Sequence, residues 1–124
     1  YILGKLTNSD VSGNIIAGSD SEGLVSLGGD CAAQPTGPWT VHHNTIHSSL
    51  VGWVVKNNGD CTGMSHATIY KVEEGLVHYF SSSEVRASNM IISDVQKGIL
   101  LNTSPGKEPE PQLTTFTDSY VAGN

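Results

Sequence analysis

The chain repeats one short pattern: a few β-prone apolar residues, a turn, a glycine, and a second apolar stretch. The glycines that mark it are Gly23, Gly52, Gly75 and Gly98, which lie 29, 23 and 23 residues apart. An internal spacing of roughly 20 to 50 residues is the signature of stacked-repeat proteins. Glycine interrupts every stretch that would otherwise have helical periodicity. The pattern therefore predicts an all-β fold, a right-handed parallel β-helix of about four to five coils.

Aligning the repeats on their glycines gives two columns that are wholly apolar. The first column is Leu24, Trp53, Leu76 and Ile99, and the second is Val25, Val54, Val77 and Leu100. Strands of a parallel sheet that are buried on both faces show such continuous apolar runs. Both columns are expected to pack on the core or be covered from outside, and the pattern does not decide which one faces inward.

Asparagines recur at a similar distance before the glycines. Asn14, Asn44 and Asn89 precede their glycines by 9, 8 and 9 residues. We expect them to lie above one another at a corner of the coil, where stacked amides hydrogen-bond along the axis. The glycines themselves are expected at corners that need positive φ or a close approach of the backbone.

The repeats divide residues 1–124 into one solenoid segment without a second domain. Two loops interrupt it at 30–39 and 104–111, where proline and glycine prevent strand pairing. The coils are expected at about 11–29, 40–56, 67–80, 84–102 and 113–124. Because a solenoid exposes apolar faces at uncapped ends, we expect the segment to belong to a longer protein.

Composition and charge restrict the partners. The formal net charge is −6, from 12 acidic and 6 basic side chains, so no basic surface is available for nucleic acid or an anionic membrane. No apolar run approaches the roughly 18 residues of a membrane-spanning helix. The 14 glycines and the 15% of charged residues are typical of turn-rich β structure.

The two cysteines lie at nearly equivalent places on successive repeats. Cys31 follows Gly23 by 8 residues, and Cys61 follows Gly52 by 9. Adjacent strands are about 4.8 Å apart, and a disulfide joins Cα atoms about 4.4–6.8 Å apart. The spacing predicts a Cys31–Cys61 disulfide and an oxidising compartment. The alternative is two free thiols in a cytosolic repeat protein.

Two segments resemble a known family. Residues 14–19, Asn-Ile-Ile-Ala-Gly-Ser, with Gly23 and Cys31, resemble a coil of the fibrocystin (polyductin) and fibrocystin-L family. Trp39 and residues 44–48, Asn-Thr-Ile-His-Ser, are similar to the family's next coil, although Ile46 replaces a small residue. The likeness is good over about 11–80 and looser to 103. It implies a large extracellular protein of cilia or other cell surfaces, with polycystin-type channels among its partners. Related coils occur in hyaluronan-degrading proteins that carry G8 domains.

Three histidines, His42, His43 and His47, are candidate metal ligands. In an extended strand His43 and His47 share a face and His42 opposes them. Zinc sites need three or four convergent ligands, so the sequence predicts no metal and no cofactor. His66 and His78 are expected at the surface or at a corner.

Catalytic residues are not predicted either. Glycoside hydrolysis needs two carboxylates roughly 5–9.5 Å apart, and no column of the repeat supplies such a pair. Asn102 begins an Asn-Thr-Ser sequon for N-glycosylation, weakened by Pro105.

The function expected from the sequence is structural. The segment is predicted to be a rigid part of a fibrocystin-like ectodomain, at a ciliary or flagellar surface, that presents loops to protein partners or to a filament assembly. The alternative is a β-helix of the G8-domain group that degrades or binds a glycan such as hyaluronan. Trp39, Trp53, Tyr70 and Tyr79 would serve binding if they were exposed.

Overall fold

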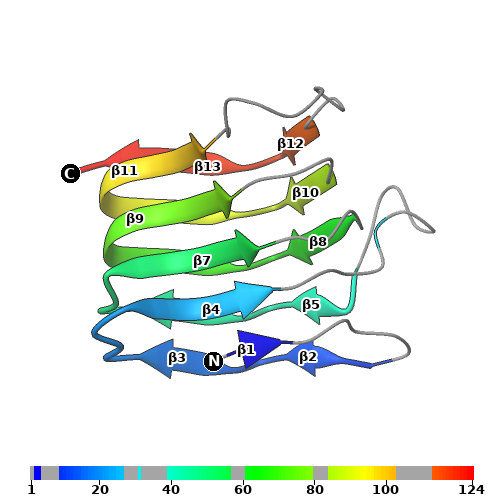
Figure 1. Ribbon diagram of the computed structural model, residues 1–124, viewed down its shortest axis with the longest axis horizontal. Coiled ribbons are helices and arrows are strands. Elements are labelled where there is room, and N and C mark those ends of the chain that lie inside the picture. The colour runs from blue at the N-terminus through cyan, green and yellow to red at the C-terminus, as the bar shows by residue number, and fades with distance from the viewer. Residues whose placement is uncertain are drawn as a thin grey trace.

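The computed structural model describes residues 2–3, 9–26, 31, 39–56, 61–79, 84–102 and 113–124 (Figure 1). All regular elements among these residues are β-strands, and every strand pairing is parallel. The strands form two sheets. The structure therefore confirms the all-β and parallel parts of the predicted fold class.

The first sheet has five strands in the order β12-β10-β8-β5-β2. They are β2 (Val11–Ser12), β5 (Val41–His42), β8 (Thr62–Ser65), β10 (Glu84–Ser88) and β12 (Leu113–Thr117). Neighbours in this sheet come from successive repeats, which lie one above the other in Figure 1.

The second sheet has eight strands and follows the path β1-β4-β7-β9-β11-β13, with β3 and β6 paired beside the start of β9. Its strands are β1 (Ile2–Leu3), β3 (Ile15–Ala17), β4 (Glu22–Ser26), β6 (Thr45–His47), β7 (Val51–Lys56), β9 (Thr68–Tyr79), β11 (Ile91–Asn102) and β13 (Tyr120–Gly123). The second repeat has two separate strands in this sheet, β6 and β7. In the third and fourth repeats a single long strand, β9 or β11, takes the place of both.

Left-handed backbone marks two corners in each of the first four repeats and one corner in the fifth. The first corner, between the two sheets, is formed by Gly13, His43, His66, Asn89 and Asp118, with φ between 49° and 67°. The second corner is formed by Gly18, Ser48, Lys71 and Asp94, with φ between 53° and 73°. Glycine adopts this conformation freely, and Asn, Asp and His adopt it more readily than other residues. The residue types at the first corner therefore fit its backbone.

The core lies between the two sheets and is built from columns of like residues. Ile46, Ile69 and Ile92 are in register in the second sheet and are fully buried. The column that begins with Leu24 lines this same core, whereas Val25, Val54 and Val77 form a separate buried cluster. The column that begins with Leu24 is therefore the one that faces inward. Ile99, the last member of the inner column, is 38% exposed because β13 pairs only with Ile91, Ile92 and Val95 of β11.

The four repeat glycines are required by close packing. A Cβ atom on Gly75 would lie 2.6 Å from Cγ2 of Ile92 and 2.6 Å from the carbonyl oxygen of Gly98. A Cβ atom on Gly23 would lie similarly close to Cγ2 of Ile46, and one on Gly52 to Cγ2 of Ile69. Positive φ among the described glycines occurs at Gly13 and Gly18 instead. Each repeat glycine thus makes room for the β-branched residue of the following repeat.

The structure corrects the predicted column of three asparagines. Asn14 and Asn44 precede Ile15 and Thr45, which are in register, but the residue in register before Ile91 is Met90. Asn89 belongs one position earlier, at the first corner. The equal intervals of 9 residues were misleading because the first repeat has one extra residue between Gly18 and Gly23.

The third repeat also begins earlier than its predicted start at residue 67. Strand β8 pairs with β5 and β10 in the first sheet. Its sequence, Thr-Gly-Met-Ser, carries little β-propensity because a glycine interrupts it. Gly63 is needed there because the ring of Trp39 occupies the space that a side chain would take.

Candidate functional site

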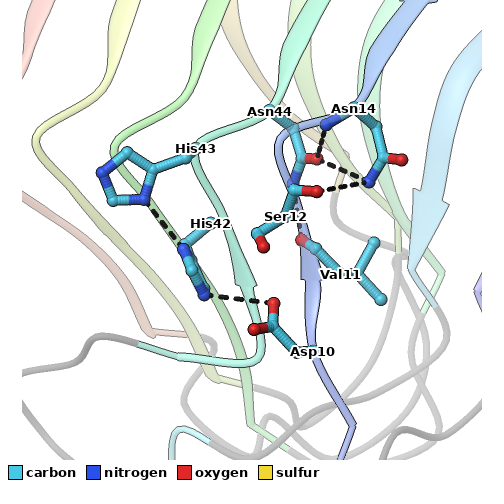
Figure 2. Close-up of polar contacts among 7 residues, drawn as sticks. All are labelled: Asp10, Val11, Ser12, Asn14, His42, His43 and Asn44. Carbon is cyan, nitrogen blue, oxygen red and sulfur yellow. Dashed lines mark hydrogen bonds and ion pairs between the residues drawn. The ribbon is translucent and has the colours of Figure 1, made fainter.

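Two asparagines clamp the first corner between repeats one and two. Asn44 is 1% exposed, and its Oδ1 accepts hydrogen bonds from the backbone N–H and the Nδ2 of Asn14, at 3.1 and 3.0 Å (Figure 2). Its Nδ2 donates to the carbonyl oxygen of Val11 at 2.8 Å. A buried amide with these partners fixes one repeat on the next.

Beside this pair of asparagines, four polar residues form what we term the corner cluster: Asp10, His42, His43 and His66. Nδ1 of His42 lies 2.8 Å from Nδ1 of His43, and Nε2 of His42 lies 3.2 Å from Oδ1 of Asp10 (Figure 2). The His66 ring stacks on the His43 ring, with centroids 4.7 Å apart and planes 5° from parallel. Three imidazoles from two repeats are thereby gathered on the outer surface.

The backbone explains why these histidines meet. His43 and His66 occupy equivalent places at the first corner. Their backbone N–H groups donate to the backbone carbonyl oxygens of Ser65 and Ser88, respectively, both at 3.0 Å. The positive φ of His43 turns its ring back toward His42. The expectation that His42 and His43 lie on opposite faces was wrong, because it assumed an extended strand through both.

His47 is not part of the cluster. It lies in β6, and its ring stacks on Tyr70 of β9 with centroids 4.9 Å apart. Among the described residues, no group of three or more His, Cys, Asp or Glu side chains is arranged to hold a metal ion.

The predicted disulfide is present between Cys31 and Cys61, with Cα atoms 5.3 Å apart. Trp39 is 3% exposed and packs with both cysteines. Arg86 donates from Nη1 to the carbonyl oxygen of Cys31 at 3.0 Å and from Nε to Glu84 at 2.6 Å. This group of residues links the residues that precede β5 and β8 to β10 of the same sheet.

Several predicted features lie outside the described residues. They are residues 30, 32–38 and 104–111 of the two loops, and Thr103 and Ser104 of the sequon. Asn102 itself ends β11.

His78 is a residue that the sequence reasoning misplaced. It is 1% exposed, and its Nδ1 lies 3.2 Å from Oγ1 of Thr114 on the opposite sheet. Burial lowers the pKa of the imidazole from its ordinary value, because the charged form is poorly solvated there. Its position two residues after Leu76, on the same side of β9, was the available signal.

Two carboxylates on the second sheet stand in ion pairs with lysines. Glu22 pairs with Lys56 at 3.1 Å, and Glu74 pairs with Lys97 at 2.8 Å. Hydrogen bonds from Ser21, from its own backbone N–H and from Lys56 lower the pKa of Glu22 to about 2. With its pKa lowered in this way, Glu22 cannot act as a general acid near neutral pH.

Comparison with known proteins adds no assignment: the chain matches no protein-family profile, no curated protein sequence and no solved structure. No helix in the described part of the chain is long and apolar enough to cross a membrane.

Proposed function

We propose that this chain is a structural segment, a right-handed parallel β-helix that serves as a rigid spacer in a fibrocystin-like cell-surface protein. The observation that carries the proposal is the unbroken register of like residues across repeats. Leu24, Trp53 and Leu76 follow one another in the core, as do Ile46, Ile69 and Ile92. In a solenoid each repeat contacts only its neighbours, so the repeats stack in one direction. A stack of this kind holds its two ends at a fixed separation.

An extracellular, ciliary or flagellar location belongs to the same proposal. The Cys31–Cys61 disulfide supports an oxidising compartment. The partners would be cell-surface proteins, a polycystin-type channel or a filament assembly among them, and they would meet the loops and corners of the segment. The resemblance in residues 14–19 and 44–48 is what favours this class.

A glycan-binding role is the second candidate, favoured by one observation. His47 and Tyr70 stack face to face on the outer surface of the second sheet and are only partly buried, so they form an accessible aromatic pair. Sugar rings pack on accessible aromatic rings through their apolar faces. Two of the aromatic residues considered for this role are excluded, because Trp39 is 3% and Trp53 0% exposed.

One experiment separates the candidates. The chain is incubated with hyaluronan and a panel of other glycans, with and without calcium, while polymer length and retention are followed. The structural proposal predicts neither shortening nor retention. Retention that is lost in Tyr70→Ala but kept in Tyr120→Ala, an exposed aromatic on another strand, would replace it with glycan binding. Shortened polymer would replace it with glycan degradation.

A further inference from the structure

The geometry of the corner cluster points to a binding site for a divalent transition metal ion, with Cu²⁺ the preferred ion. The two ligands would be Nδ1 of His42 and Nδ1 of His43, which already face each other at 2.8 Å. This inference does not depend on the proposed structural function.

Hydrogen bonding prepares His42 for this role. The Asp10 carboxylate only accepts hydrogen bonds at neutral pH, so Nε2 of His42 carries the proton in that contact. In the neutral ring, Nδ1 is then a bare lone pair, and it accepts from Nδ1–H of His43. On metal binding the proton of His43 moves from Nδ1 to Nε2, and both rings rotate so that the two Nδ1 lone pairs converge on one ion.

The short spacing favours a metal with neighbouring ligands near a right angle. If the two nitrogens stay about 2.8 Å apart after the rings rotate, metal–nitrogen bonds of about 2.0–2.1 Å give an angle of about 85° at the ion. That angle matches neighbouring ligands in the square-planar or tetragonal geometry of Cu²⁺ and Ni²⁺, whereas tetrahedral Zn²⁺ needs nitrogens about 3.3 Å apart. Cu²⁺ also leads the affinity order of these ions for nitrogen ligands. Water would complete the coordination.

Neighbouring side chains orient the two ligand histidines as is usual at metal sites. A metal-bound histidine usually donates its second N–H to a carboxylate, and Asp10 stands in that position. The His66 ring lies flat on the His43 ring and supports one of its faces. Asp10 and His66 are therefore positioning residues, and the side chain of Asp10 is 70% exposed, so its removal should not disturb folding.

The test is a titration of the tag-free chain with Cu²⁺, Ni²⁺ and Zn²⁺ by calorimetry, together with paramagnetic resonance of the Cu²⁺ complex. We expect one Cu²⁺ per chain, bound more tightly than Zn²⁺, and a spectrum with two coordinated nitrogens. His42→Gln and His43→Asn should each leave one coordinated nitrogen and greatly weaken binding, and His43→Asn retains a residue suited to left-handed backbone. Asp10→Ala should weaken binding by about 10–100-fold. His47→Gln, outside the cluster, should bind as the natural chain does.

The inference is overturned if His42→Gln and the natural chain bind Cu²⁺ alike, or if the spectrum does not change in His43→Asn. Circular dichroism establishes that each variant is folded. Should His43→Asn lose its structure, His42→Gln and Asp10→Ala still decide the question.

Discussion

At the scale of single residues, identical side chains have different roles in different repeats. Asn44 acts through its amide, which is buried and makes hydrogen bonds to Asn14 and Val11. Asn89 acts through its backbone, which has a φ of 52° at the exposed first corner. The sequence shows both as an asparagine before an apolar strand, so only the register separates the two roles.

Replacing each asparagine by glycine should distinguish these roles. Asn44→Gly removes a buried amide and leaves its partners unsatisfied, so we expect a loss of about 1–3 kcal/mol in the free energy of unfolding. Asn89→Gly keeps a residue that adopts positive φ, so a change within about 0.5 kcal/mol is expected. Urea denaturation measures both, and equal losses would contradict the assigned register.

Gly75 provides a test of the close packing between repeats. In Gly75→Ala the new methyl group would overlap Ile92 and the backbone of Gly98, and we expect a loss of about 1–3 kcal/mol. Gly123→Ala is the matched control, because its nearest atom, the carbonyl oxygen of Val95, is 3.6 Å away. If the two variants unfold at the same urea concentration, close packing is not the reason for glycine at position 75.

The buried His78 should make the fold sensitive to mild acid. Its pKa is lowered in the folded chain, so the unfolded chain binds more protons below the unfolded value of about 6.5. Stability should therefore be fully present above that pH and fall as the pH drops toward the folded pKa. Thermal unfolding as a function of pH measures this, and His78→Gln should flatten the profile whereas His47→Gln should not. A profile unchanged by His78→Gln would show that another group controls the response.

At the scale of elements, the sequence predicts the strands that contain long apolar runs and misses those defined by their neighbours. The core strands β7, β9 and β11 follow from apolar columns after a glycine. Strand β8 has no such column, and it forms because β5, β10 and Trp39 surround it. The corner cluster was equally hidden, since left-handed backbone at a histidine has no clear signal in one sequence.

The disulfide is the element-scale feature with the largest expected effect. Cys31 and Cys61 are separated by 30 residues, so the link should contribute about 3–4 kcal/mol by constraining the unfolded chain. Reduction should lower the melting temperature of the natural chain and leave the double variant Cys31→Ala/Cys61→Ala unchanged. Peptide mapping without reductant should recover the two cysteines linked, and a free, alkylatable Cys31 would contradict the assignment.

At the scale of the whole molecule, the account depends on repeats that stack in order with a constant step. Ile15, Thr45, Thr68, Ile91 and Tyr120 form one outward-facing column of the second sheet. Parallel strands in a sheet are about 4.8 Å apart, so separations along this column should depend on the number of repeats crossed. They should not depend on the number of residues between the labelled positions.

The most direct measurement is a set of distances between paired spin labels on this column, with the native disulfide intact. One label is fixed at Ile15 and the second is placed at Thr68, Ile91 or Tyr120, since all four side chains are at least partly exposed. The account predicts backbone separations of about 10, 14 and 19 Å, rising in equal steps. Distances that do not rise from Thr68 to Tyr120 would contradict the stacked arrangement and the spacer function that rests on it.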